Sequence, residues 1–375
     1  MIKVFANFGY HPIYETFYTD PPKNIVFICR SKNITKFSDL YIYRSKRYSI
    51  LKRIYIKIQR ILKFIRYWFV GKTNADYVWG SRGFVPITNK PFIIDIEHPA
   101  SFISMENQHL LLNHFVRIQI LKALKDAKYI FPHCNATKKV MMLYTQHYWK
   151  KIKDKTYTLY PVIKLHRDKP KSLSNTEIKL VFIGRLFFFK GGREVLESSI
   201  ELSKKYDIKL YLITKLPKIY EKKIRKYDFI IYHSFLPKKK VFHILSHSDI
   251  LVHPSYFDTF GYVLLEAMSF GLPIVASNHY AIPEIVKDSY NGFLINTEKY
   301  NIYTTNNVVG RWHLSSILHK NKKEIVKQIV DKLSMLIEDT KLYREISKNN
   351  INEIKYGKFS IERRNSLLEE LLVRI

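Results

Sequence analysis

The sequence predicts an α/β protein built from two doubly wound, Rossmann-like domains. Apolar runs of strand length alternate with segments of helical periodicity through the first half of the chain, and this order favours a parallel sheet. A second alternation of the same kind begins at Ile178, after a polar, lysine-rich stretch. With 375 residues, the chain is long enough for two domains that each bury a core of their own.

The composition shift near the middle of the chain sets the expected domain boundaries. We expect an N-terminal domain over residues 1–165, a linker over residues 164–176 and a C-terminal domain over residues 177–345. Helices over residues 346–375 are expected to cross back to the first domain. The two domains should face each other across a cleft, with ligands at the carboxyl ends of the strands.

Each expected element follows from the spacing of its apolar residues. Runs rich in Ile, Val, Phe and Tyr predict strands, while a spacing of three and four predicts helices. The strands expected in the first half are 3–7, 25–29, 40–43, 77–79, 92–96 and 129–132, and its helices are 49–70, 108–125 and 136–148. The strands expected in the second half are 178–183, 209–214, 229–233, 250–253, 273–276 and 292–295. Residues 301–321 are polar and predict an irregular loop, and helices follow from Lys323 onward.

The segment from Ser255 to Gly271 carries the most chemical information. It places Asp258 at an expected helix start and Glu266 inside the helix, so the two carboxylates lie about 12 Å apart along the axis, too far to share one proton or one metal. The amides of Thr259, Phe260 and Gly261 would open the helix and favour a phosphate. A nucleotide sugar fits this arrangement, because its diphosphate lies between a sugar and a ribose. The segment alone is equally compatible with an N-capping Asp258 and a solvated Glu266.

A second loop with phosphate-binding chemistry follows the strand that begins at Ile178. Gly184 and Arg185 end this strand, and Lys190 precedes two glycines and a helical pattern. Glycine lets the backbone approach a phosphate closely, and the two cations would neutralise it. Taken alone, the loop also fits ordinary turn chemistry, because the insert Phe187-Phe188-Phe189 is more apolar than a phosphate site requires.

Three motifs in a fixed order carry a resemblance to a known family. The chain runs G-R-L-F-F-F-K-G, then H-P-S-Y-F-D-T-F-G-Y-V-L-L-E-A-M-S-F-G, then I-P-E-I-V-K-D-S-Y-N-G-F-L-I. This order resembles the GT4 family, the glycosyl transferases group 1, which are retaining glycosyltransferases with the GT-B fold. The resemblance covers roughly residues 178 to 295 and extends only loosely to the N-terminal half.

The resemblance implies roles for the residues at the matching positions. Glu266 matches the second acid of the family's E-x7-E motif, which binds the ribose hydroxyls of the donor. Asp258 matches the first acid, near the donor sugar, and is one methylene shorter than the family's glutamate. Arg185 and Lys190 match the pair that neutralises the diphosphate, in the loop that begins at Gly184. Glu284 and Gly292 match positions that we interpret as structural.

The acceptor side is less clearly marked. The family's N-terminal glycine-rich loop is reduced to Gly9. His98, in the run Ile93 to Pro99 that ends a strand, is the candidate for the family's histidine beside the reacting sugar. A histidine bonded to backbone at a strand end is the alternative. Asp95 and Glu97 form a D-x-E that falls outside the donor half, so we expect no metal site there. No cofactor is expected beyond the nucleotide-sugar co-substrate.

A net charge of +31 calls for an anionic partner or surface. We expect no specific nucleic acid, because the sequence has no zinc-finger, RNP-like or basic-zipper pattern. The segment 49–70 alternates Ile, Leu and Phe with Lys and Arg at helical spacing, with Trp68 near one end. Such a basic amphipathic helix fits an anionic membrane surface, and equally a helix packed on a sheet. No apolar run is long enough to span a membrane.

Together these patterns predict a metal-independent hexosyltransferase. It would move a hexose from a UDP- or GDP-sugar to a lipid-linked or glycan acceptor, in cell-surface glycan biosynthesis. Cys29 and Cys134 form no disulfide framework, and the N-terminus has no signal-peptide pattern, so we expect a cytoplasmic protein, peripheral on the cytoplasmic membrane face. The alternatives are a non-catalytic nucleotide- or sugar-binding relative and a basic nucleic-acid-binding protein.

Overall fold

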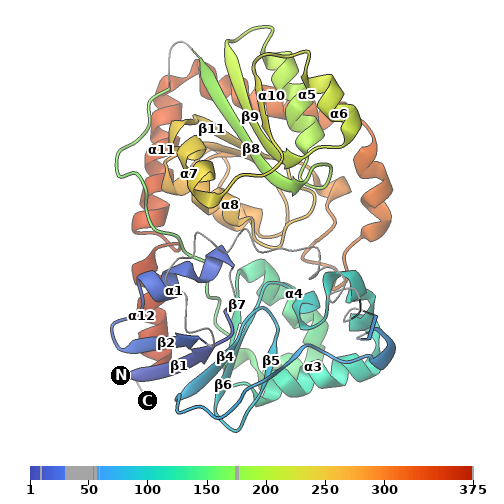
Figure 1. The fold of residues 1–375 in the computed structure, drawn as a ribbon, viewed down its shortest axis with the longest axis vertical. Helices are drawn as coiled ribbons and strands as arrows, with labels where there is room; N and C mark the ends of the chain where they lie inside the picture. The colour runs from blue at the N-terminus through green and yellow to red at the C-terminus, as the bar shows by residue number, and fades with distance from the viewer. Residues whose placement is uncertain (9–10, 30–53, 55–56, 59, 174–176, 374–375) are drawn as a thin grey trace. The chain divides into compact units, whose positions relative to one another are not determined.

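The computed structural model describes residues 1–8, 11–29, 54, 57–58, 60–173 and 177–373, in two compact units (Figure 1). The first unit comprises Met1–Val162, Thr305–Gly310 and Ile361–Ile375. The second comprises Ile163–Thr304 and Arg311–Ser360. Each unit contains its own parallel sheet and its own apolar core.

The first unit is built on a five-stranded parallel sheet with the order β2-β1-β4-β6-β7. Its strands are β1 (Ile2–Ala6), β2 (Ile25–Cys29), β4 (Tyr77–Gly80), β6 (Phe92–Ile96) and β7 (Tyr129–Pro132). Ala6 lies opposite both Cys29 and Trp79, and Ile96 lies opposite Pro132. The loops that follow the strands therefore leave from one edge of the sheet, where parallel α/β proteins bind their ligands. The expected strand 40–43 lies outside the described residues.

The helices of the first unit cover this sheet. They are α1 (Glu15–Thr19), α3 (His114–Asp126), α4 (Asn135–Thr145) and α12 (Ile361–Leu372), with short 3-10 helices at Pro12–Tyr14, Pro99–Phe102, Met105–Leu112, Gln146–Lys151 and Lys153–Lys155. Helix α3 begins where the Asn113 side chain accepts hydrogen bonds from the backbone N–H groups of Phe115 and Val116. Its buried residues Val116 and Ile120 recur at helical spacing and face the core.

The helix expected over residues 49–70 is wrong in its second half. Residues 60–62 are helical, but Lys63 has a positive φ of 48°, which ends the helix. The chain then forms β3 (Tyr67–Phe69), which pairs in parallel with β5 (Val85–Ile87). Ile65, on the expected apolar face, is fully buried in the core of the first unit. Residues 49–53, 55, 56 and 59 lie outside the described residues.

The second unit is built on a six-stranded parallel sheet with the order β10-β9-β8-β11-β12-β13. Its strands are β8 (Ile178–Leu186), β9 (Ile208–Lys215), β10 (Ile230–His233), β11 (Ile250–His253), β12 (Ile274–Ser277) and β13 (Phe293–Ile295). Its helices are α5 (Gly192–Leu202), α6 (Lys218–Ile224), α7 (Lys238–His247), α8 (Tyr262–Ser269), α9 (Ile282–Ile285), α10 (Lys323–Glu338) and α11 (Thr340–Lys355). The expected α/β class is confirmed, since both sheets are parallel and helices separate most consecutive strands.

Two segments far along the chain complete the first unit. Val308 and Val309 pack against its core, and the Gly310 N–H donates to the Gln108 side chain at 2.8 Å. In α12, the buried Arg364 guanidinium donates to the Thr16 hydroxyl and to the backbone carbonyls of Thr16 and Asp20. Helix α11, by contrast, packs on α8 in the second unit.

A buried ion cluster fixes the start of α10 to α5 in the second unit. Glu194 on α5 accepts from Lys322 and from Arg193, each at 3.1 Å, and all three side chains are buried. Removing one partner of such a cluster would leave a buried charge uncompensated, which typically costs about 3–5 kcal/mol. The segment expected as an irregular loop over residues 301–321 leads into this cluster and contains a short 3-10 helix, Trp312–His319.

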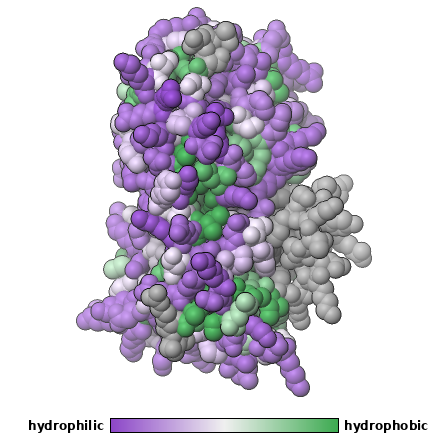
Figure 2. Space-filling model, turned by 90° about the vertical axis from the view of Figure 1, so that its left-hand side faces the viewer, coloured by the Kyte–Doolittle hydropathy of each residue, from purple (hydrophilic) through white to green (hydrophobic). Residues whose placement is uncertain are grey.

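The surface of the molecule reflects the composition. Figure 2 shows one face, on which hydrophilic side chains predominate and apolar side chains gather in smaller areas between them. Among the described residues, no helix combines the length and the apolar character that a membrane crossing requires.

Candidate donor site and the polar network of the first unit

The order of strands in the second unit marks where a ligand would bind. From β8 the chain moves outward through α5 to β9 and then to β10, after which it returns to place β11 on the other side of β8. The loops after β8 and β11 therefore leave the sheet at a topological switch point, the usual position of ligands in open α/β sheets. The residues expected to bind the donor all lie at the end of β8, on these two loops or on the helix that follows the second.

Two glycines let the loop after β8 fold tightly around Lys190. A Cβ atom on Gly184 would lie 2.8 Å from the Lys190 Cβ atom, so the lysine packs directly on the glycine backbone. Gly191 has a φ of +72°, and a Cβ there would lie 2.3 Å from the Pro254 carbonyl oxygen. The apolar insert has a structural role, because Phe187 is buried in the core while Phe188 and Phe189 pack against it.

Lys190 and Asp258 form a partly buried ion pair. The Lys190 Nζ atom lies 2.6 Å from Asp258 Oδ2 and donates to the Phe257 carbonyl at 2.8 Å. The two side chains are 18% and 14% exposed, so the pair is only weakly screened by water. Burial alone would raise the pKa of Asp258, but the Lys190 ammonium and His253 together hold it well below its ordinary value. Asp258 is therefore ionised at neutral pH.

Two buried histidines hold Asp258 from different strands. His253, at the end of β11, has its Nε2 atom 3.1 Å from Asp258 Oδ2. His279, after β12, accepts the backbone N–H of Asp258 through Nε2 at 2.9 Å. Burial lowers the pKa of His279 to about 3, so this ring is neutral and its proton sits on Nδ1. The next residue, Tyr280, has a φ of 46°, a strained value for a non-glycine residue.

The helix after this loop begins later than expected. Helix α8 starts at Tyr262, with Gly261 as its N-cap at φ 89°, so Asp258 is not at the helix start but precedes it by a short loop. Thr259 and Phe260 belong to that loop. Glu266 lies inside α8 and is half-buried, and its carbonyl accepts the hydroxyl of Ser269.

Arg185, the remaining residue predicted for the donor site, lies at the exposed end of β8. In the described residues it forms no ion pair, whereas Lys190 on the same loop is already paired with Asp258. The structure thus brings together Gly184, Lys190 and Asp258 and leaves Arg185 at the surface. Glu284, which we interpret as structural, lies in the first turn of α9. At Gly292, also interpreted as structural, an added Cβ would lie 2.5 Å from the Ile274 carbonyl oxygen.

His98 lies in the first unit and caps a short helix. Its Nδ1 atom accepts the Ala100 N–H at 3.1 Å, while the backbone N–H of His98 donates to the Ser101 hydroxyl at 3.2 Å. The ring is fully buried, and burial lowers its pKa to about 3. This geometry matches the backbone-bonded alternative that the sequence left open.

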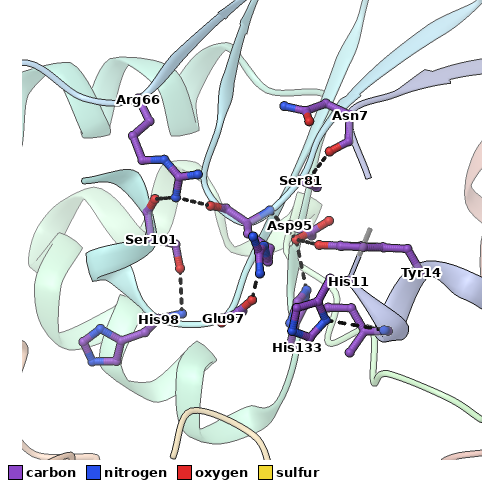
Figure 3. A network of polar contacts seen from close by, with 12 residues as sticks. Asn7, His11, Tyr14, Arg66, Ser81, Asp95, Glu97, His98, Ser101 and His133 are labelled. Atoms are coloured by element: carbon purple, nitrogen blue, oxygen red, sulfur yellow. Dashed lines mark hydrogen bonds and ion pairs between the residues drawn. The ribbon is translucent and has the colours of Figure 1, made fainter. Parts of the chain in front are cut away.

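A buried polar network surrounds Asp95 in the same unit (Figure 3). Asp95 Oδ1 accepts hydrogen bonds from the Tyr14 hydroxyl at 2.8 Å and from the backbone N–H of Arg82 at 2.7 Å. The same oxygen lies 3.0 Å from His133 Nε2. Asp95 Oδ2 accepts the Trp79 Nε1–H at 2.8 Å. Both oxygens are thus used within the protein, and the described residues contain no group of three metal-ligating side chains.

Sequence reasoning missed the histidines of both sites. His253 and His279 in the donor half, and His11 and His133 in the first unit, were not among the candidate residues. The available signal was position, because each of them ends or follows a strand of a parallel sheet, at the edge where ligands bind.

Two doubly wound units with parallel sheets, and a lysine–carboxylate pair at the switch point of the second, fit a glycosyltransferase of the GT-B type. Residues 166–302 match the family described as glycosyl transferases group 1. This match covers the donor half of the chain and confirms the resemblance of its motifs to the GT4 family. The chain is accordingly a glycosyltransferase that uses a nucleotide-sugar donor.

Individual relatives agree with this assignment. The uncharacterized glycosyltransferase MJ1069 of Methanocaldococcus jannaschii is 25% identical over 350 residues, which cover 88% of this chain and 80% of that protein. Anabaena Alr3699/HepE, solved in complex with UDP and glucose, is 14% identical with a TM-score of 0.60 over 100% of both chains. WaaG, a glycosyltransferase involved in lipopolysaccharide biosynthesis, is 15% identical with a TM-score of 0.57 over 99% of this chain and 100% of its own. At these identities the two solved structures establish the fold alone.

Proposed function

We propose that this protein is a retaining hexosyltransferase that moves a hexose from a nucleotide-diphosphate sugar to a lipid-linked or glycan acceptor. The observation that carries the proposal is the ion pair between Lys190 and Asp258 at the switch point of the second unit. It places a cation and an ionised carboxylate side by side, as a ligand with a diphosphate next to a sugar requires. Glu266, farther along in α8, would bind the ribose hydroxyls.

The charges in the site suit departure of a nucleoside diphosphate. The bond between the sugar's anomeric carbon and the β-phosphate oxygen breaks, and its electron pair leaves with the phosphate. Lys190 and Arg185, with the amides of Thr259, Phe260 and Gly261, would stabilise this developing negative charge without a metal ion. The acceptor oxygen forms the new bond on the same face of the sugar, and its proton passes to the departing phosphate. Asp258 would accept hydrogen bonds from the sugar hydroxyls.

His98 has a less direct part in this proposal. It remains our prediction for the histidine of the N-terminal half, but its ring is bound to the backbone of the 3-10 helix Pro99–Phe102. We therefore propose that it shapes the loop after β6. The UDP and glucose bound to HepE favour a UDP-sugar over a GDP-sugar as the donor to test first.

A membrane-facing role is supported by the described part of the segment 49–70. Ile58, Ile61 and Leu62 are 43%, 75% and 59% exposed, and the neighbouring Lys57 and Arg60 are exposed as well. Exposed apolar residues interleaved with cations fit an anionic lipid surface. We propose a cytoplasmic protein that associates peripherally with the membrane to reach its acceptor.

The donor site can be tested by ligand-induced stabilisation. UDP, GDP, ADP and their sugar conjugates would be added in EDTA to the wild type, to Glu266→Ala and to Glu201→Ala, whose exposed side chain on α5 serves as control. A ligand at 100 times its Kd adds about 2.7 kcal/mol to the free energy of unfolding. One nucleotide should raise the melting temperature of the wild type and the control but not of Glu266→Ala. If no nucleotide stabilises the wild type, the proposed donor site is wrong.

A further inference from the structure

A second group of polar side chains gathers at the edge of the first unit's sheet. His11 follows β1, Arg82 follows β4, Glu97 follows β6 and His133 follows β7. These four residues come from loops at the carboxyl ends of parallel strands. Figure 3 shows His11, Glu97 and His133 around the buried Asp95, and the backbone N–H of Arg82 donates to the same carboxylate. None of the expected site residues belongs to this group.

Asp95 fixes the orientation of His133. The carboxylate takes donors on both oxygens, and His133 Nε2 lies 3.0 Å from Oδ1, in a pair of which both side chains are at least 95% buried. A carboxylate can only accept, so the proton of this bond is on His133 Nε2. In its neutral form the His133 ring then presents Nδ1 as a hydrogen-bond acceptor.

His11 is held in the same tautomer as His133 but leaves the other ring nitrogen, Nε2, for a ligand. Its Nδ1 atom accepts the Ile13 N–H at 3.5 Å, as the N-cap of the short helix Pro12–Tyr14. Burial lowers the pKa of His11 to about 4, with Glu97, Arg82, His133 and Asp95 as its titratable neighbours. The ring is therefore neutral at pH 7, its proton is on Nε2, and it presents a donor close to His133.

One donor and one acceptor together match a hydroxyl group. A hydroxyl can donate its proton to His133 Nδ1 and accept from His11 Nε2–H. A phosphate, by contrast, needs several donors and positive charge. In the described part of this group the cation is Arg82, which already lies 3.6 Å from Glu97 Oε1.

We propose that this edge of the first unit binds the acceptor as a neutral sugar, with His133 and His11 bound to its hydroxyl group. The proposal rests on the glycosyltransferase function proposed above and names the class of acceptor, a glycan or glycolipid hydroxyl in place of a lipid phosphate. Asp95 acts as a positioning residue, because it reaches the acceptor only through His133.

The experiment separates acceptor binding from donor chemistry. The protein is incubated with UDP-glucose and with the other nucleotide sugars that stabilise it. Water is the acceptor in one arm, p-nitrophenyl gluco-, galacto- and mannosides in the second, and undecaprenyl phosphate in the third. Each arm is run with the wild type, His133→Phe, His11→Gln and the control His109→Gln, an exposed histidine of the same unit. His11→Gln leaves the Asp95 hydrogen bonds intact, so it tests the site even where His133→Phe weakens the fold.

Three results would support the proposal. The wild type should transfer to at least one glycoside, and both histidine variants should lower kcat/KM for that glycoside by about tenfold or more, as loss of one good hydrogen bond predicts. Hydrolysis of the nucleotide sugar should change by less than about threefold in His11→Gln, in keeping with a lesion confined to the acceptor side. The control should match the wild type in every arm.

The opposite results are equally distinct. Transfer to undecaprenyl phosphate and to none of the glycosides would overturn the neutral-sugar class. Equal losses of hydrolysis and transfer in His11→Gln would show that the histidines act on the fold or on the donor, which also overturns the proposal. A wild type that neither hydrolyses nor transfers any nucleotide sugar would contradict the proposed glycosyltransferase function itself.

Discussion

His279 binds the backbone of Asp258: its Nε2 atom accepts the Asp258 N–H at 2.9 Å, across 21 residues of sequence. The contact ties the loop before α8 to the loop after β12. The same aspartate receives Lys190 and His253 on its carboxylate, so its position is fixed at both ends of the residue. Two histidines thus hold this aspartate, one at its carboxylate and one at its backbone.

We expect His279→Ala to weaken donor binding more than it weakens the fold. The variant leaves the partly buried Asp258 N–H without an acceptor, which costs about 1–3 kcal/mol and frees the loop to move. Isothermal titration with the stabilising nucleotide should show a Kd raised by about tenfold. His279→Gln keeps an acceptor oxygen and should recover most of the affinity. Equal affinities in all three proteins would contradict the positioning role.

Lys190→Ala should lower glycosyl transfer by about a hundredfold or more, because it removes one preorganised cation from the developing phosphate charge. Initial rates in EDTA and in MgCl2 would measure this effect, and we expect wild-type activity to persist in EDTA. Lys204→Ala, an exposed lysine after α5, is the matched control. A nearly unaffected Lys190→Ala, or a wild type that depends on the metal, would refute this account of leaving-group stabilisation.

Gly191→Ala should destabilise the second unit strongly. A Cβ atom at this position meets the Pro254 carbonyl oxygen at 2.3 Å, and the φ of +72° disfavours any other residue. A loss of at least about 2 kcal/mol is expected, in the range typical of backbone strain plus steric overlap. Gly71→Ala, where an added Cβ has no atom within 4 Å, should be nearly neutral. Urea unfolding of both variants would decide, and equal midpoints would contradict the close approach.

Three buried histidines make stability depend on pH. Burial lowers the pKa values of His98 and His279 to about 3 and that of His11 to about 4, from an ordinary 6.5. Between these values and pH 6.5 the unfolded chain binds more protons, so their contribution is complete above pH 6.5 and is lost as the pH falls toward the folded-state pKa. Each histidine should cost on the order of 1–2 kcal/mol by pH 5.

Denaturant midpoints at pH 7 and pH 5 test this dependence. His98→Asn keeps a capping acceptor but cannot titrate, so its loss of stability between the two pH values should be smaller than that of the wild type. His147→Gln changes an exposed histidine and should follow the wild type. If His98→Asn loses as much stability between pH 7 and pH 5 as the wild type, protonation of His98 does not contribute to that loss.

The exposed apolar residues near the end of the 54–62 segment should contribute to membrane binding. Ile61→Ser combined with Leu62→Ser removes two side chains that are 75% and 59% exposed. Co-sedimentation with vesicles of phosphatidylglycerol and phosphatidylcholine at low salt should fall severalfold, in proportion to the apolar area lost. Ile219→Ser, which changes an equally exposed residue on α6, should leave binding unchanged. Failure of the wild type to sediment would contradict the membrane proposal.

Local patterns sufficed for most of the fold. The strands at 25–29, 92–96, 129–132 and 250–253 match the structure at both ends, because buried parallel strands are short, continuous apolar runs. The segment around Ile65 failed for a related reason, since a helical spacing of apolar residues does not reveal that the chain turns at Lys63 and starts a strand. Only the sheet partner, β5, distinguishes the two outcomes.

The candidate site was predicted where a local motif defines it. Lys190 and Asp258 were named from glycine-flanked and acidic motifs, and they meet at 2.6 Å. Their histidine partners come from β11 and from the loop after β12, and the contact of His279 with Asp258 depends on strand order, which single-sequence periodicity does not encode. The network around Asp95 was missed for the same reason, because its members lie on β4, on β6, on a 3-10 helix and on the loops after β4 and β7.

The packing of α12 onto the first unit bears on the order in which the chain folds during synthesis. Arg364 reaches the backbone of Thr16 and Asp20, and Tyr129 donates to the Leu371 carbonyl at 2.7 Å, so β1 to β7 are translated long before their last packing partner. On the ribosome, the second unit can complete its core while the first still waits for α12. The unit that is made first is therefore finished last, and until then its uncovered apolar surface is a natural target for chaperones.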